Sequence, residues 1–188
     1  MLNLPNTLTL IRILTIPVFL EFLAYHRYLE ALVVFVIGGL TDFLDGFAAR
    51  WMKQQTALGA YLDPVADKML VIASYIMLSS IGGIPAWLAV VVVARDILIL
   101  VGYGVIHVSV AERLQVRPSR MGKWSTTLQL LTLGLALGLL HDAKMFPHEV
   151  LDLFVGLTAL ATVVSGCHYL YQGLVWLQRK APSILPPG

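Results

Sequence analysis

The sequence predicts an all-α fold, a bundle of six membrane-spanning helices in a single domain that covers residues 1–188. Three observations predict this fold. Of the 188 residues, 58% are hydrophobic and only 13% are charged, whereas a soluble domain carries about 25% charged residues. The mean hydropathy is +0.80. The length accommodates about six spans of about 20 residues each, and it leaves no room for a large soluble domain.

Apolar segments separated by polar or turn-forming residues set the six expected helices. The breaks are HRY at 26–28, KQQT at 53–56, GGIP at 82–85, the basic stretch 111–123 and HDAK at 141–144. The segments between them predict helices at 7–25, 29–51, 60–80, 86–108, 122–141 and 148–177. The first segment contains Arg12 and follows no basic stretch, so we expect a retained span and not a cleaved signal peptide.

The basic residues divide unequally between the two sides of the expected bundle. One side holds Arg27 and Lys144, and the other holds Arg50, Lys53, Arg113, Arg117, Arg120, Lys123, Arg179 and Lys180. Loops rich in Lys and Arg stay in the cytoplasm. We therefore expect an integral protein of the bacterial inner membrane with both termini in the cytoplasm.

Four carboxylates stand near the cytoplasmic ends of the second and third expected helices. They are Asp42, Asp45, Asp63 and Asp67. Each ionised Asp costs about 2.5–3.5 kcal/mol at the centre of a membrane helix, so four unpaired charges would cost on the order of 10 kcal/mol. A sequence that keeps such a cluster needs something that neutralises it.

Divalent cations are the best candidates for that neutralisation. The spacings i, i+3 for Asp42 and Asp45 and i, i+4 for Asp63 and Asp67 place each pair on one helix face. Two adjacent helices can turn these faces toward one cavity. Oxygen ligands suit Mg²⁺, Mn²⁺ or Ca²⁺, and four carboxylates can hold two metals about 4 Å apart. The alternatives are a structural ion pair with Lys68 or Arg95 and a pathway for protons or cations.

Small residues and one arginine surround the acids. Gly46, Ala49 and Gly59 leave room for a ligand, or they serve close helix packing. Arg50 lies about one turn from Asp45, where its guanidinium could hold a phosphate or anchor the helix end at the interface.

Read as a pattern, the acidic segment is Asp42-x2-Asp45-Gly46-x2-Ala49-Arg50-x8-Gly59-x3-Asp63-x3-Asp67. It is similar, with no departure, to the signature of the CDP-alcohol phosphatidyltransferase family. The segments Asn3–Arg12 and Leu62–Lys68 also resemble members of the glycerophospholipid branch of that family.

The resemblance implies a fold, an activity and a set of site residues. It implies a six-helix membrane fold, commonly dimeric, with its site open to the cytoplasm, and transfer of a phosphatidyl group from CDP-diacylglycerol to an alcohol with release of CMP. It implies two divalent cations, Mg²⁺ or Mn²⁺. By resemblance Asp42, Asp45 and Asp63 are metal ligands, and Asp67 is both a ligand and the catalytic base. The implied nucleotide pocket consists of Asn6, Thr9, Gly46, Ala49, Arg50, Thr56 and Gly59.

The acceptor is expected to carry a phosphate. The basic stretch that contains Arg117, Arg120 and Lys123 either attracts anionic lipids in general or, with Arg95, forms an acceptor-phosphate pocket. Cardiolipin synthases of the eukaryotic type use phosphatidylglycerol, and phosphatidylglycerophosphate synthases use glycerol 3-phosphate. Ala94-Arg95-Asp96 departs from the Ala-Arg-Glu of the second group, and Pro118 with Gly122–Gln129 is more similar to the first. We therefore expect phosphatidylglycerol as the acceptor, with glycerol 3-phosphate as the alternative and an inositol phosphate as a minor option.

Two rival functions remain open from the sequence. An intramembrane prenyltransferase also uses acid pairs with Mg²⁺, and a cation transporter would also keep acids in the membrane. The expected partners are membrane lipids and a second copy of the chain, and no nucleic acid.

Overall fold

The computed structural model describes residues 4–52, 57–109 and 120–180, and side chains over 13–41, 68–102 and 121–175. The described residues form six α-helices and no strand. The helices are α1 Leu4–Ala24, α2 Tyr28–Met52, α3 Ala57–Ser80, α4 Ala86–Ser109, α5 Arg120–His141 and α6 His148–Lys180. The prediction of an all-α fold is confirmed, and each predicted helix end lies within three residues of the observed one.

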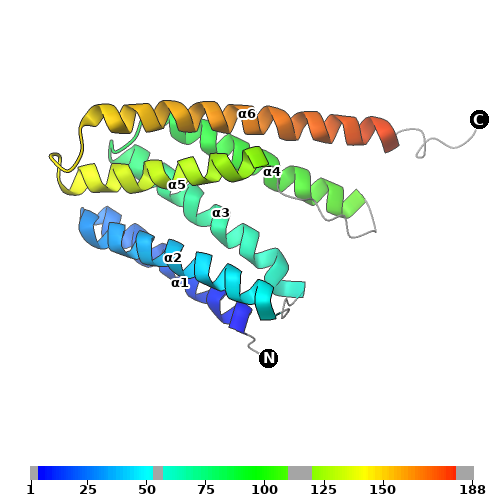
Figure 1. Ribbon diagram of the computed structural model, residues 1–188, viewed down its shortest axis with the longest axis horizontal. Helices are drawn as coiled ribbons and strands as arrows, with labels where there is room; N and C mark the ends of the chain where they lie inside the picture. The colour runs from blue at the N-terminus through cyan, green and yellow to red at the C-terminus, as the bar shows by residue number, and fades with distance from the viewer. Residues whose placement is uncertain (1–3, 53–56, 110–119, 181–188) are drawn as a thin grey trace, which may run out of the picture.

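Consecutive helices form three antiparallel hairpins, α1–α2, α3–α4 and α5–α6. The three hairpin turns lie at one end of the molecule, and the start of α1 and the end of α6 lie toward the other end (Figure 1). Contacts of α1 with α3, α2 with α5, and α4 with α6 join the hairpins. The turns at 25–27, 81–85 and 142–147 therefore share one end, which leaves the acidic ends of α2 and α3 at the opposite end.

Two of the hairpin turns begin with a residue in the left-handed backbone region. His26 has φ 56° and ends α1, and Gly82 has φ 77° and ends α3. After α3, the Gly83 N–H donates a hydrogen bond of 2.8 Å to the Leu78 carbonyl oxygen. This pattern satisfies the last carbonyl groups of a helix and reverses the chain within a few residues. The next helix consequently starts beside the previous one.

The hydrophobic core is built mainly from the halves of the helices near these turns. Tyr75 and Leu78 of α3 are completely buried there. They pack with Phe19, Leu23, Ala31, Val71, Ile84, Leu88, Ala89, Val92, Leu133, Ala136, Leu137 and Val155. Close packing of large apolar side chains in this half fixes the arrangement of the helices. It thereby also fixes where their other ends, which carry the acidic segment, lie relative to one another.

Neutral polar side chains line the contact between α5 and α6. We call this set the hydroxyl seam; it consists of Ser125, Gln129, Thr132, Thr158 and Thr162, all completely buried. The Thr132 and Thr158 hydroxyl oxygens lie 2.8 Å apart, and Gln129 Nε2 lies 3.3 Å from the Thr162 hydroxyl oxygen. Hydrogen bonds between such side chains hold helices together where water is absent.

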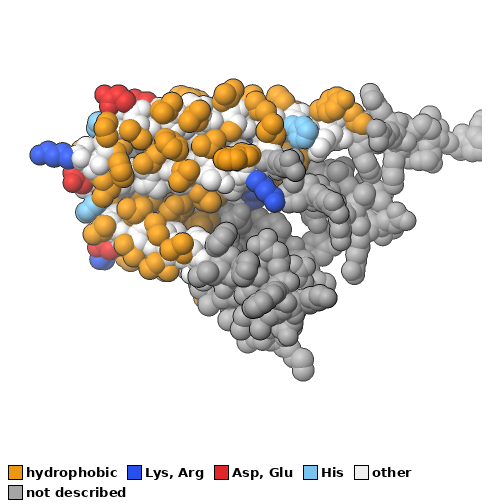
Figure 2. All heavy atoms as spheres, in the orientation of Figure 1, with side chains coloured by type: hydrophobic (Ala, Val, Ile, Leu, Met, Phe, Trp, Pro, Cys, Tyr) orange, Lys and Arg blue, Asp and Glu red, His pale blue; other side chains and the backbone are white. Residues whose placement is uncertain are grey.

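The outer surface carries many large apolar side chains, with charged residues gathered near the hairpin turns (Figure 2). Leu153, Leu160 and Leu174 of α6 are each about 60% exposed. Within the described ranges, only the segment His148–Val175 is both long and apolar enough to cross a membrane by itself. Shorter apolar segments lie at Ile13–Ala24, Tyr28–Thr41 and Lys68–Ser80.

Candidate functional site

The four predicted metal ligands lie on helices. Asp42 and Asp45 belong to α2, and Asp63 and Asp67 belong to α3. The helical backbone gives each pair the one-face arrangement that its spacing requires. The side chains of all four lie outside the described residues. Their convergence on a common cavity therefore stays a prediction.

The predicted nucleotide pocket draws on the same half of the chain. Asn6 and Thr9 lie on α1, Gly46, Ala49 and Arg50 on α2, and Gly59 on α3, and their side-chain surroundings lie outside the described residues, as does Thr56 entirely. Of the predicted acceptor residues, Arg117 lies outside the described residues, and Arg120 is described only as the first residue of α5. The other two, Arg95 and Lys123, are described in full.

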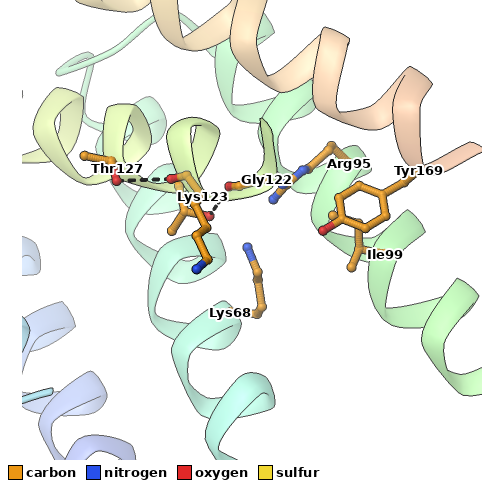
Figure 3. A pocket seen from close by; sticks show the side chains of 8 residues that line it. Lys68, Arg95, Ile99, Gly122, Lys123, Thr127 and Tyr169 are labelled. Atoms are coloured by element: carbon orange, nitrogen blue, oxygen red, sulfur yellow. Dashed lines mark hydrogen bonds between the residues drawn. The ribbon is translucent and has the colours of Figure 1, made fainter. Parts of the chain in front are cut away.

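A cavity of about 430 Å³ brings Arg95 and Lys123 together with a third base, Lys68 (Figure 3). Four helices contribute to its wall. The lining residues are Lys68 of α3, Arg95 and Ile99 of α4, Gly122, Lys123, Thr126 and Thr127 of α5, and Tyr169 of α6. Lys68 follows Asp67 directly in α3. The cavity therefore adjoins the acidic segment.

A single buried carboxylate ties two of these bases together. Asp96 Oδ1 accepts a hydrogen bond of 2.9 Å from Lys68 Nζ and one of 2.6 Å from Arg95 Nη1. Arg95 Nη2 donates a bond of 2.8 Å to Ser165 Oγ on α6. Its guanidinium carbon also lies 5.8 Å from the centre of the Tyr169 ring, within the range of a cation–π interaction. The ion pairs that we considered for Lys68 and Arg95 thus involve Asp96, a carboxylate outside the acidic motif.

The described charges around the cavity leave a positive surplus. Three bases, Lys68, Arg95 and Lys123, face one carboxylate, Asp96, so the described groups sum to +2 (3 − 1 = 2). Lys123 is exposed, whereas Arg95 is 5% exposed and Asp96 has no exposed surface. Buried or partly buried cations that line a cavity make a good site for an anion. The Thr126 and Thr127 hydroxyls donate their hydrogen bonds to the carbonyl oxygens of Gly122 and Lys123. The arrangement suits a phosphate group.

The side chains that the structure describes offer no competing metal site, since no group of three or more His, Cys, Asp or Glu residues gathers among them. The donor set of the acidic segment consists of carboxylates, which are the ligands that Mg²⁺ and Mn²⁺ prefer. The residues present in α2 and α3 therefore fit a hard divalent cation.

The sequence predicts two of the eight residues that line the cavity, Arg95 and Lys123, and it assigns no acceptor role to Lys68, Asp96 or Ser165. Lys68 was considered only as an ion-pair partner, and Asp96 only as a marker of one branch of the family; Ser165 carried no signal. An Arg-Asp dipeptide within an apolar helix was the available signal, because a buried carboxylate requires basic partners. The basic partner on α3 is Lys68, and its contact with Asp96 depends on how α3 packs against α4.

Comparison with known proteins places the whole chain among lipid-synthesising enzymes. The sequence model described as CDP-alcohol phosphatidyltransferase matches residues 2–166. A CDP-diacylglycerol–glycerol-3-phosphate 3-phosphatidyltransferase of Pseudomonas fluorescens is 37% identical over 197 aligned positions, which cover 100% of this chain and 94% of that protein.

Two further relatives carry different names. The enzyme of the same name from Haemophilus influenzae is 34% identical over 176 positions, covering 89% of this chain and 91% of that protein. The human cardiolipin synthase (CMP-forming) is 30% identical over 184 positions, covering 89% of this chain and 61% of that protein. The match over nearly the full length, together with the helical bundle, means that this chain belongs to the CDP-alcohol phosphatidyltransferase family and is an enzyme of that family.

Proposed function

We propose that this enzyme transfers a phosphatidyl group from CDP-diacylglycerol to glycerol 3-phosphate, forming phosphatidylglycerophosphate and CMP. The observation that carries this proposal is the cavity with three bases beside the acidic segment. A phosphate monoester carries about −1.5 to −2 charges at pH 7, which complements the surplus of +2 among the described groups. Phosphatidylglycerol is a phosphodiester with a single charge, so it would leave part of that surplus uncompensated.

The relatives favour the same acceptor. The proteins from Pseudomonas fluorescens and Haemophilus influenzae are named for glycerol 3-phosphate, and they are more similar to this chain than the human cardiolipin synthase is. This reverses our preference from the sequence, which relied on Asp96 in place of Glu and on Pro118 with Gly122–Gln129. Asp96 bridges two bases through its carboxylate. Because both Asp and Glu supply that group, the substitution was a weak marker of the acceptor.

The proposed reaction is a displacement at the phosphorus atom that carries the diacylglycerol. Members of this family generally use divalent metal ions, and such ions bound by Asp42, Asp45, Asp63 and Asp67 would neutralise the diphosphate and the departing CMP. We assign to Asp67 the removal of the proton from the acceptor hydroxyl. The new bond joins the acceptor oxygen to phosphorus, and the bond from phosphorus to CMP breaks.

The remaining residues would hold the two substrates. Lys68, Arg95 and Lys123 bind the acceptor phosphate in this proposal. The nucleotide would lie along α1, α2 and α3, beside Arg50. Arg117 and Arg120 stay predictions for the acceptor side. The acyl chains of the donor would remain in the bilayer.

We also propose that all six helices cross the bacterial inner membrane, with the termini and the active site on the cytoplasmic side. The shortest helix has 21 residues, or about 31 Å at 1.5 Å per residue, which matches a hydrocarbon core of about 30 Å. The apolar outer surface supports contact with lipid. Alkaline phosphatase fused after Arg27 should be active in the periplasm, whereas a fusion after Lys180 should be inactive. The opposite pattern would reverse the orientation.

An assay with the purified full chain tests the reaction. The enzyme would receive CDP-diacylglycerol with Mg²⁺ or Mn²⁺, and either glycerol 3-phosphate or phosphatidylglycerol as the acceptor. We expect CMP and phosphatidylglycerophosphate with the first acceptor. Cardiolipin from the second acceptor, with no product from the first, would contradict the proposed acceptor. A homodimer is a separate prediction, and the mass of the complex in detergent would test it.

A further inference from the structure

Asp96 occupies an unusual place for a carboxylate. It lies within the apolar helix α4, has no exposed surface, and contacts two bases that come from different helices. Its Oδ1 atom accepts both hydrogen bonds, while Oδ2 has no hydrogen-bond partner among the described residues. A buried carboxylate is costly unless it is paired. This arrangement therefore needs a reason beyond packing.

The two bases meet at Asp96 from opposite directions. Lys68 reaches it from α3, and Arg95 reaches it from the neighbouring position of α4. Residues i and i+1 of a helix do not face each other. The long Arg95 side chain nevertheless returns to Asp96 and extends to Ser165 on α6. The carboxylate therefore fixes both cations at the boundary between α3, α4 and α6.

The fixed cations line the cavity. In Figure 3 the ends of the Lys68 and Arg95 side chains point toward each other, on one side of Lys123. Without the Asp96 charge, the two cations would repel each other, and Lys68 would lose the partner that orients its flexible side chain. Asp96 itself is not among the residues that line the cavity. It acts through its neighbours.

We propose that Asp96 is a positioning residue that, through Lys68 and Arg95, sets the geometry of the pocket for the acceptor's phosphate group. This inference rests on the proposed function, because it assigns the cavity to the acceptor. Ser165 supports the same geometry from α6, because it fixes the second terminal nitrogen of Arg95.

The experiment measures steady-state kinetics of Asp96→Asn, Asp96→Glu and Ser165→Ala in the full chain. For Asp96→Asn we expect the KM for glycerol 3-phosphate to rise about tenfold or more, as is typical when an orienting partner is removed. The KM for CDP-diacylglycerol should change less than about twofold, because the donor binds elsewhere. Asp96→Glu keeps the charge and should restore most of the affinity for the acceptor. Ser165→Ala should raise the acceptor KM about threefold, since the Arg95 guanidinium loses one hydrogen bond but keeps its bond to Asp96.

Two further measurements separate positioning from general stability. Thr158→Val removes an equally buried hydroxyl from α6, within the hydroxyl seam, and should leave both KM values unchanged. Inorganic phosphate should inhibit competitively with the acceptor, and its Ki should rise in Asp96→Asn in parallel with the KM. The Ki of inorganic phosphate depends on the pocket alone. A general loss of stability would therefore not raise this Ki while leaving the KM for CDP-diacylglycerol unchanged.

The outcomes are distinct. If Asp96→Asn fails to fold, Ser165→Ala and Asp96→Glu still report on the pocket. An unchanged acceptor KM and phosphate Ki in the folded variants would overturn the role of Asp96, as would equal rises in the KM of both substrates. If the unmodified enzyme used only phosphatidylglycerol, the proposed function would fail. The Ki of inorganic phosphate against that acceptor would then still test Asp96, and a rise in Asp96→Asn would support its role.

Discussion

Two sets of polar side chains in the described part of the bundle differ in their net charge. In the hydroxyl seam the polar groups are neutral and bind one another across α5 and α6, as Thr132 and Thr158 do at 2.8 Å. In the charged cluster of Lys68, Arg95 and Asp96, two cations share one carboxylate beside an open cavity. A neutral set that forms hydrogen bonds between two helices holds those helices together. A set with surplus charge facing a cavity can bind an anion.

The largest effect on activity is expected at Asp67, the proposed base, which precedes Lys68 of the charged cluster in α3. Asp67→Asn should lower the rate of CMP release about 10²- to 10⁴-fold, because the proposed base for the acceptor hydroxyl is lost. Release of CMP from CDP-diacylglycerol measures this rate, and thermal unfolding in detergent checks that the variant folds. Turnover equal to that of the unmodified enzyme would remove Asp67 from the role of base.

The next effect concerns the guanidinium of the charged cluster. Arg95→Gln should raise the KM for glycerol 3-phosphate about 30- to 150-fold, equivalent to about 2–3 kcal/mol for a buried charged group. Lys68 remains as a partner for Asp96, so the fold should persist. The KM for CDP-diacylglycerol is the internal control. A larger loss of donor affinity than of acceptor affinity would assign the cavity to the donor.

Lys123 should contribute less, because it is exposed. Lys123→Ala should raise the KM for glycerol 3-phosphate about two- to fivefold, as expected for a charge in contact with solvent. The difference from the unmodified enzyme should shrink as the ionic strength is raised, since salt screens exposed charges. An effect as large as that of Arg95→Gln, and insensitive to salt, would mean that Lys123 becomes buried when the acceptor binds.

The smallest effect belongs to the hydroxyl seam. A double-mutant cycle of Thr132→Val and Thr158→Val should give a coupling free energy of about 0.6 kcal/mol in the unfolding reaction, the average for hydrogen bonds between membrane helices. Both KM values should stay unchanged. A selective rise in the acceptor KM would break the distinction between the two polar sets, because it would make the seam part of the binding site.

The fold could be predicted from the sequence more completely than the site. Long apolar segments alternate with polar turns such as 26–28 and 82–85, and this alternation sets the helix ends directly. The bond between Lys68 and Asp96 joins residues 28 positions apart on two helices. Hydrophobic periodicity does not encode which faces of α3 and α4 meet. Sequence reasoning therefore identified Arg95 and Lys123 as acceptor candidates but left out Lys68.

The acceptor preference shows a second limit of sequence reasoning. The sequence favours phosphatidylglycerol because Ala94-Arg95-Asp96 departs from Ala-Arg-Glu and because Pro118 with Gly122–Gln129 is similar to the cardiolipin synthases. In the structure the Asp96 carboxylate bridges two bases. Glu would supply the same group, so this position says little about the acceptor, whereas the number of cations around the cavity bears on it in the function that we propose.

The residues that line the cavity are distributed unequally among the helices. Seven of the eight residues come from α4, α5 and α6, and only Lys68 comes from α3. The acidic motif and the proposed nucleotide residues, apart from Thr56, belong to the first three helices. If the cavity binds the acceptor as we propose, one alcohol could be exchanged for another mainly through changes in α4, α5 and α6, without changes in the helices that carry the acidic motif. A chimaera joined at the α3–α4 turn would then carry over its acceptor preference with its carboxyl-terminal part.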